Sequence, residues 1–430
     1  MATNGVPARF SLARQSTPLV GVRSGRRSPE LFESLDPRPT DAILGLIAEY
    51  NNDPRPQKID LGVGVYRTVD GETPVLDVVK QAERQIVETQ TSKGYLGTAG
   101  EPAFNAAMQS LIFGDTASRE RLTTVQTPGG SGSLRVAASL LKKAVPDGPI
   151  WVSDPTWNNH APLLGGAGLE LKPYPYYDTG RHVIRVDAML AALREIPKGE
   201  TVLFHACCHN PSGLDPSDEN WRAITEIIVE RELLPFIDMA YQGFSRGLDE
   251  DAFAIRHMAQ QVPELIVSSS CSKNFGLYRD RVGTLSILTA DASTSATIRS
   301  QLSYIARTIY SMPPDHGAAI VSAVLGDTAL TTKWHAELAE MRERLRDMRV
   351  LLNDALQDKA PDHDFSHLVR ATGMFCFLGI SAEQIEALKK DYGIYVVDSS
   401  RINIAGITPA NVDYFAESIA AVVGARHAGE

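Results

Sequence analysis

The chain has 430 residues, of which 43% are apolar and 22% are charged, a composition typical of a folded protein with two or three lobes. Its formal net charge of −10 at pH 7 argues against non-specific nucleic-acid binding, which needs a basic face. No apolar run approaches the roughly 20 residues that span a bilayer, so we expect neither a nucleic-acid nor a membrane partner.

The first 28 residues differ in composition from the rest of the chain. They contain five arginines, several serines and no acidic residue before Glu30. This composition is typical of an organellar transit peptide, but also of a disordered tail. The four cysteines show no framework spacing, which favours a reducing compartment. We therefore expect a cytoplasmic protein, or a mitochondrial matrix protein if residues 1–28 are a transit peptide.

The next part of the chain predicts a helix and then an alternation of strands and helices. Thr40 can cap a helix with an apolar stripe formed by Ile43, Leu44, Leu46 and Ile47. From about residue 76, amphipathic stretches separate the short apolar runs "PIWVSD", "TVLFHACC", "LLPFIDM", "ELIVSSS" and "GTLSILT". Strands that alternate with helices predict an α/β fold with a mostly parallel sheet covered on both faces.

The C-terminal part predicts a second lobe. Residues 335–358 carry apolar side chains at near-heptad spacing and predict a long amphipathic helix between the lobes. Beyond it, "MFCFLGI" and "GIYVVDSSRINIAG" predict the short strands of a smaller α+β lobe. We expect a tail at residues 1–28, an N-terminal arm with part of the small domain at 29–75, a large domain at 76–340, and the C-terminal small domain at 341–430.

Polar side chains directly follow the predicted strands. In open α/β sheets, ligands bind outside the carboxyl ends of the strands. These positions hold an indole, an amide, a carboxylate, a phenol, hydroxyls and a lysine, at Trp157, Asn210, Asp238, Tyr241, Ser270, Ser272 and Lys273. Because the set is too polar for a core and too varied for a solvated face, it predicts a binding site.

A Gly-rich turn that leads into an Ala/Leu-rich helix, residues 127–144, predicts a phosphate site, because the free N–H groups at a helix start suit an anion. The turn is not a P-loop, since Ser133 stands where a lysine is needed, and Arg135 replaces the third glycine of a dinucleotide fingerprint. A lysine, a phosphate site, an aromatic ring and a buried carboxylate together indicate pyridoxal phosphate.

The chain resembles the aspartate/aromatic amino-acid aminotransferases in six segments that occur in the family's order: "TPGGSGSLR", "SDPTWNNH", "HACCHNPSG", "DMAYQGF", "SSCSKNFGLYRDR" and "SSRINIAG". The resemblance extends from about residue 33 to about residue 425. It implies a homodimeric enzyme that depends on pyridoxal 5′-phosphate. It also implies fold type I, with a mostly parallel seven-stranded sheet between helices in the large domain and a small α+β domain.

The resemblance also implies catalytic roles. Lys273 matches the lysine that binds the cofactor covalently and moves a proton during the reaction. Asp238 matches the carboxylate that keeps the ring nitrogen protonated, and Tyr241 and Asn210 match the groups that hydrogen-bond to the ring oxygen. Trp157 matches the aromatic side chain stacked on the ring.

Further residues match the family's cofactor and substrate contacts. His160 is expected to orient Asp238 from behind. The phosphate would be held by Gly130, Ser131, Ser270, Ser272 and Arg281, with Tyr95 from the other subunit. The substrate would be bound by Gly64, Trp157, Asn210, Arg401 and, from the partner chain, Arg307. Arg401 would bind the α-carboxylate through a bidentate fork, and Arg307 a side-chain carboxylate.

Two alternatives concern the chemistry. His205, Cys207 and His209 would face one way on a strand and are plausible zinc ligands, but no second ligand cluster lies elsewhere and the family carries this string without metal, so we expect none. The same fold also supports lyases, decarboxylases and regulators without catalysis. We favour an aminotransferase because the complete catalytic set is present.

The substrate is expected to be L-aspartate, an aromatic L-amino acid, or both, with 2-oxoglutarate as acceptor, giving L-glutamate by a ping-pong mechanism. Val65 and Thr73 resemble the aspartate-specific members, whereas Gly94, Ser131 and Met312 depart from their pattern. We therefore expect dual specificity, with strict aspartate specificity as the alternative.

Overall fold

The computed structural model describes residue 32, residues 35–37 and residues 42–424. The expected tail at residues 1–28 and the expected helix cap at Thr40 lie outside the described residues. All helices and strands discussed below belong to the compact unit that begins at Ala42. Within the described ranges, no helix is both long enough and apolar enough to cross a membrane.

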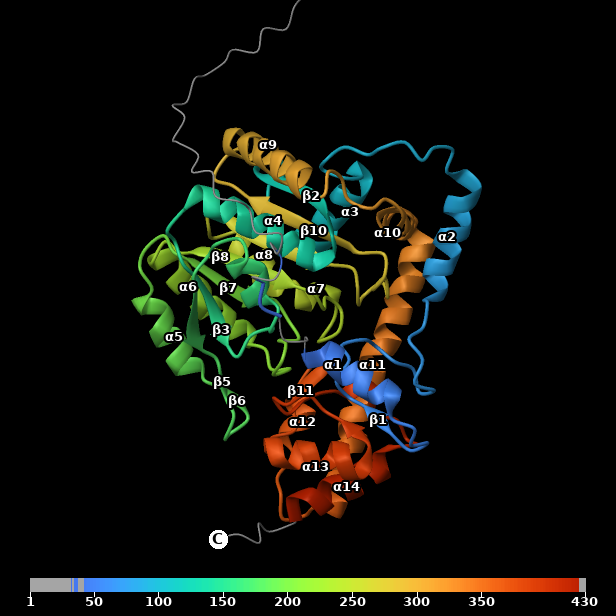
Figure 1. The fold of residues 1–430 in the computed structure, drawn as a ribbon. Coiled ribbons are helices and arrows are strands. Elements are labelled where there is room, and N and C mark those ends of the chain that lie inside the picture. The colour runs from blue at the N-terminus through green and yellow to red at the C-terminus, as the bar shows by residue number, and fades with distance from the viewer. Residues whose placement is uncertain (1–31, 33–34, 38–41, 425–430) are drawn as a thin grey trace, which may run out of the picture. The chain divides into compact units, whose positions relative to one another are not determined.

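A seven-stranded sheet organises the larger part of the fold (Figure 1), and its strand order is β2-β10-β9-β8-β7-β3-β4. Strand β10 runs antiparallel to both its neighbours, and the other pairs are parallel. The strands are β2 (Leu122–Pro128), β3 (Ile150–Asp154), β4 (Leu171–Pro175), β7 (Thr201–His205), β8 (Leu234–Met239), β9 (Leu265–Ser270) and β10 (Val282–Leu288). The expected mostly parallel seven-stranded sheet is confirmed.

The two edge strands, β2 and β4, were not among the predicted strands. Strand β4 contains Pro173 and Pro175, and proline is tolerated in a sheet mainly at an edge, where one side of the strand needs no partner. Strand β2 has the sequence LTTVQTP, which is too polar to be recognised as an apolar run. Its Gln126 is fully buried, with its side chain bonded to backbone groups of neighbouring loops.

Helices cover both faces of the sheet, as the alternating pattern predicts. Helices α4 (Gly129–Ala144) and α9 (Ala292–Ile309) bury their apolar residues against one face. The residues of the other face belong to a second, larger cluster. Its helices in this region are α3 (Pro102–Phe113), α5 (Val186–Glu195), α6 (Asp218–Glu230), α8 (Phe253–Ala259) and α10 (His316–Gly326).

The long helix predicted at residues 335–358 is α11 (Thr328–Lys359), which begins earlier because Asp327 accepts the N–H groups of Ala329 and Leu330. In Figure 1 it runs from beside α10 and α2 (Asp77–Thr89) to the C-terminal elements. These elements are α12 (His367–Arg370), β11 (Phe375–Phe377), α13 (Ala382–Tyr392), β12 (Ile394–Tyr395), β13 (Arg401–Asn403) and α14 (Val412–Gly424).

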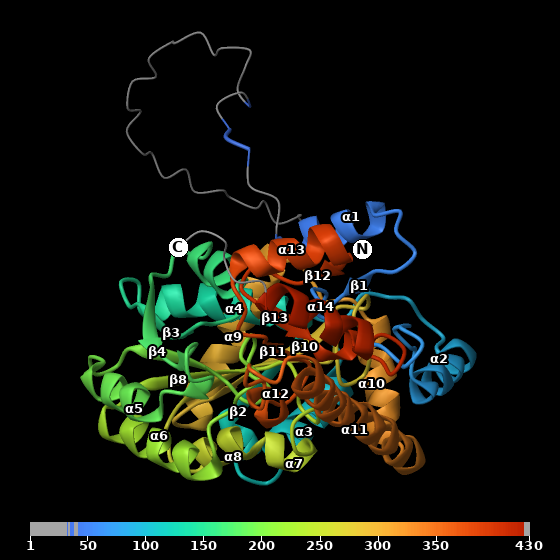
Figure 2. The same ribbon diagram turned by 90° about the horizontal axis from the view of Figure 1, so that it is seen from below.

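The N-terminal elements pack against this C-terminal part (Figure 2). Strand β1 (Ile59–Asp60) pairs in parallel with β12, and β11 pairs antiparallel with β13. Helix α1 (Ala42–Asn52) buries Leu46 against Tyr395 and Val397. These contacts agree with the expected arm at residues 29–75, although the four-part division of the chain stays a prediction.

Candidate active site

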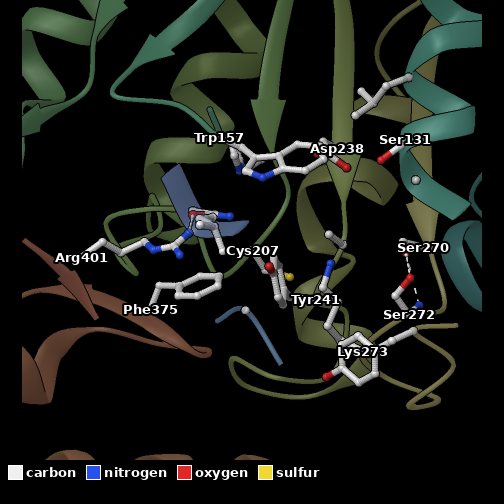
Figure 3. Close-up of a pocket in the computed structure, with 18 of the residues that line it drawn as sticks. Ser131, Trp157, Cys207, Asp238, Tyr241, Ser270, Ser272, Lys273, Phe375 and Arg401 are labelled. Atoms are coloured by element: carbon white, nitrogen blue, oxygen red, sulfur yellow. Dashed lines mark hydrogen bonds between the residues drawn. The ribbon is translucent and has the colours of Figure 1, made fainter. Parts of the chain in front are cut away.

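A pocket with a cavity of about 230 Å³ lies at the carboxyl ends of β7, β8 and β9 (Figure 3). Twelve of its lining residues were expected from the sequence: Gly64, Gly130, Ser131, Trp157, Asn210, Asp238, Tyr241, Ser270, Ser272, Lys273, Arg281 and Arg401. Others were not predicted to line it: Ile43, Leu134, His205, Cys207, Ala240, Tyr278 and Phe375. Residues from Ile43 to Arg401, which are far apart in the chain, therefore meet in one cavity.

Lys273 follows β9 and is partly buried in the pocket wall, with its Nζ 4.7 Å from the centre of the Tyr241 ring. Burial lowers the pKa of Lys273 to about 8, and the Arg281 charge acts in the same direction, while Asp238 opposes it. Because a nucleophilic or basic amine must be neutral, Lys273 can do this chemistry close to neutral pH.

Asp238 lies on β8, and its Oδ2 accepts a hydrogen bond from Nε2 of the fully buried His160 at 3.2 Å. The other ring nitrogen of His160 bonds to the Thr156 hydroxyl at 2.8 Å, so the imidazole is held from both sides. Burial raises the pKa of Asp238, but the hydrogen bond from His160 and the attraction of nearby basic groups such as Lys273 outweigh it, so the net pKa is lowered. The side chain therefore stays a carboxylate, and His160 lies behind it, outside the pocket.

The start of α4 and the end of β9 form a cluster of donors. Ser270 Oγ donates to Ser272 Oγ at 3.0 Å, and Arg281 Nη1 donates to the same oxygen at 3.3 Å. No side chain caps α4, so its first N–H groups are available to a ligand. A helix start with a guanidinium and two hydroxyls is suited to a phosphate dianion.

The glycines of this segment form the first turn of α4 rather than a separate turn, because the helix already begins at Gly129. Gly129 has a φ of +67°, a conformation that favours glycine. A Cβ at this position would also lie 2.5 Å from Nη2 of Arg281. Glycine is thus needed to bring the guanidinium against the helix start.

Arg401 lies on β13 at the opposite end of the pocket. Its Nη1 donates to Asn210 Oδ1 at 3.3 Å, its Nη2 donates to the Gly62 carbonyl at 2.7 Å, and its guanidinium lies 4.3 Å from the centre of the Phe375 ring. Its Nε is buried and has no hydrogen-bond partner. A buried donor without a partner is rare, so the site is built to receive an acceptor.

Figure 3 shows how these groups are arranged. Ser131, Ser270 and Ser272 lie at one end, and Arg401 with Phe375 at the other, with Trp157, Asp238, Tyr241 and Lys273 between them. The pocket can hold an anion at each end and an aromatic ring in the middle.

Tyr95 and Arg307 do not line this pocket. The Tyr95 side chain is 97% exposed, and Arg307 is exposed near the end of α9, where it donates to Ser311 Oγ. Both were expected to act in the site of a partner chain, and that expectation stays a prediction.

The residues considered as zinc ligands have other partners. Both ring nitrogens of His209 bond to hydroxyls, of Ser153 and Ser212, each at 2.9 Å. In the part of the chain that the structure describes, another possible ligand group is Cys207, Cys208 and Asp251. Burial raises the pKa of the Cys208 thiol to about 11, which disfavours the thiolate that binds metal, and the Asp251 oxygens accept three backbone N–H groups. We assign no metal here.

Comparison with known proteins agrees with this geometry. The family model "Aminotransferase class I and II" matches residues 56–419. The chain belongs to the class I and II aminotransferases. It is 46% identical over 396 residues to the aspartate aminotransferase of Salmonella typhi, covering 91% of this chain and 100% of that protein. It is also 45% identical over 387 residues to the aromatic-amino-acid aminotransferase of Pseudomonas aeruginosa, covering 89% and 97%.

A solved structure shows the same fold. The aromatic-amino-acid aminotransferase of Burkholderia pseudomallei, covalently bound to pyridoxal phosphate, superposes with a TM-score of 0.89 at 43% identity, covering 91% of this chain and 99% of that chain. The predictions of a fold type I, pyridoxal-phosphate-dependent aminotransferase that carries out amino-acid transamination are confirmed.

The residues of this aminotransferase fit that cofactor. The donors around the start of α4 match a phosphate, Asp238 supplies a carboxylate for the ring nitrogen, and Lys273 is an amine that can be neutral. The buried Nε of Arg401 has no hydrogen-bond partner, so the guanidinium could still bind a second ligand that carries an acceptor, such as a carboxylate.

Proposed function

We propose that this aminotransferase transfers the amino group of L-aspartate and of aromatic L-amino acids to 2-oxoglutarate, giving L-glutamate, by a ping-pong mechanism. The observation that carries the proposal is that one cavity is lined by Lys273, Asp238 and Arg401, a guanidinium whose Nε has no hydrogen-bond partner. Dual specificity is supported by nearly equal identity to an aspartate and to an aromatic aminotransferase, 46% and 45%.

Each residue has a defined task in this proposal. When bound, pyridoxal phosphate supplies an electron-withdrawing ring that stabilises negative charge on the substrate's α-carbon. Arg401 binds the α-carboxylate and orients the α-hydrogen, and neutral Lys273 Nζ removes that proton and delivers it again. Asp238 would hold a proton on the ring nitrogen of the bound cofactor, and Trp157 would pack against its ring.

The second carboxylate of a dicarboxylic substrate needs a further cation, and Arg281 is already engaged with Ser272 at the phosphate end. We propose that Arg307 of a second copy supplies it in a homodimer, and that Tyr95 of that copy completes the phosphate site. The exposure of both side chains, outside their own pocket, supports this role.

The visible spectrum of the purified protein tests the proposed function. A yellow band that fades with L-aspartate and, separately, with L-phenylalanine is expected, because each substrate would convert the cofactor to its amine form. Fading with L-aspartate alone would restrict the enzyme to dicarboxylic substrates. A protein that stays colourless and inert after pyridoxal phosphate is added would contradict the proposal.

Arg307→Ala is expected to lower kcat/KM for L-aspartate by roughly 30-fold to 4,000-fold, because loss of a charge-paired contact costs about 2–5 kcal/mol. L-phenylalanine has no second carboxylate, so its kcat/KM should change far less. Arg299→Ala, on the same helix and also exposed, is the matched control. Equal losses for both substrates would show that Arg307 does not select for the side-chain carboxylate.

A further inference from the structure

Helix α11 carries a buried arginine that is outside the pocket. Arg349 is 2% exposed, and its guanidinium donates to four backbone carbonyls of the segment that leads into β11. These carbonyls and their distances are Leu368 at 3.3 Å, Thr372 at 3.2 Å, Gly373 at 2.8 Å and Phe375 at 3.0 Å. Among the residues that the structure describes, no carboxylate forms an ion pair with it within 4.0 Å.

A buried cation without a counter-charge is expensive, and an apolar side chain of similar length would fill the same space at lower cost. What the guanidinium adds is a rigid, planar set of donors that fixes several carbonyls at once. Its physical effect is therefore to define the backbone of residues 368–375, which runs from α12 through the connecting residues 371–374 to the first residue of β11.

The same segment is packed tightly against the chain beyond Asn210. Thr372 N donates to the Gly213 carbonyl at 2.7 Å, and a Cβ at Gly213 would lie 2.1 Å from the Phe375 carbonyl oxygen. Small displacements of this backbone are thus resisted by the close contact with Gly213 as well as by the hydrogen bonds of Arg349.

The side chain of Phe375 links this backbone to the pocket, because its ring contacts pocket residues. Its ring lies 4.3 Å from the Arg401 guanidinium and meets the Tyr241 ring edge-on, with centres 6.0 Å apart (Figure 3). A Cβ at Gly64 would be 3.1 Å from the Phe375 Cζ, so the ring also fills the space beside the Gly64 segment. The ring supports the face of the guanidinium, whose edge carries the hydrogen-bond donors.

We propose that Arg349 is a positioning residue for substrate binding: it holds the backbone of residues 372–375 so that Phe375 orients Arg401 toward the substrate carboxylate. The inference rests on the proposed role of Arg401. Arg349 does not touch the cofactor or the substrate, so its effect should appear in carboxylate binding and not in cofactor binding.

The test is the dissociation constant of succinate, a dicarboxylate without an amino group, measured by calorimetry on the cofactor-loaded protein. Arg349→Lys and Phe375→Leu should each raise this constant roughly ten-fold, about 1.4 kcal/mol, while the affinity for pyridoxal phosphate stays within about two-fold. Phe375→Leu leaves the four hydrogen bonds of Arg349 in place, because they end on backbone oxygens, and so tests the step from Phe375 to Arg401 separately from the step from Arg349 to the backbone. The double variant should bind succinate about as tightly as the single variant that binds it less tightly, because both changes disrupt the same chain of contacts.

Arg121→Met is the matched control. Arg121 also donates to two backbone carbonyls, of Thr289 and Pro263, but at the opposite end of the sheet, and its loss should leave succinate binding unchanged. Unchanged binding in Arg349→Lys or in Phe375→Leu, or additive losses in the double variant, would overturn the inference. If Arg401→Lys binds succinate as tightly as the parent protein, the proposed role of Arg401 itself fails.

Discussion

Lys273→Ala is expected to lower the rate of transamination by at least about 10⁴-fold, because one change removes both the covalent anchor and the general base. The donors around α4 do not involve Lys273, so the variant should still bind pyridoxal phosphate without a covalent bond. Activity assays and the cofactor content of gel-filtered protein measure the two effects separately.

Borohydride reduction followed by peptide mass spectrometry should place the cofactor on Lys273 in the parent protein and nowhere in the variant. Lys198→Ala, at an exposed position, is the control and should retain full activity. Full activity in Lys273→Ala would mean that another group performs the proton transfer.

Asp238→Asn has the second largest expected effect. The amide keeps the shape of the side chain but cannot hold a proton on the ring nitrogen by charge. Loss of one partner of a buried charge pair costs about 3–5 kcal/mol, so kcat should fall roughly 10²- to 10⁴-fold. In the cofactor-free protein the pKa of the Lys273 amine should also fall, because the carboxylate charge that favours its protonated form is lost.

Asp154→Asn makes the same chemical change at the exposed end of β3, outside the pocket lining. Its kcat should stay within about two-fold of the parent value, as for most surface changes. An equal loss in both variants would show that the Asp238 effect is not specific to the ring nitrogen.

Much of the site could be predicted because parallel strands place the residues that follow them at one edge of the sheet. Lys273, Asp238 and Asn210 were found in this way, and the resemblance added Arg281 and Arg401, which line the same cavity. His160 was expected to lie behind Asp238, and its hydrogen bond to the carboxylate agrees with that placement.

Residues that contact the site through tertiary packing gave no local signal. Phe375 lies in the run "MFCFLGI", which indicates only a buried strand, yet its ring faces Arg401. Tyr278 belongs to a recognised segment, but its contact with Tyr66, 212 residues away, has no sequence pattern. The roles of Tyr95 and Arg307 need a second chain, and the cellular location depends on residues 1–28, so these stay predictions.

The hydrogen bond between Arg401 and the Gly62 carbonyl joins residues 339 positions apart, and β1 pairs with β12 across a similar distance. On a ribosome that adds 5–20 residues per second, roughly 20–70 s pass between the synthesis of these two partners. Asp238 and Lys273 emerge well before Arg401. A nascent or prematurely terminated chain could therefore assemble much of the cofactor site while still lacking the arginine that selects the substrate.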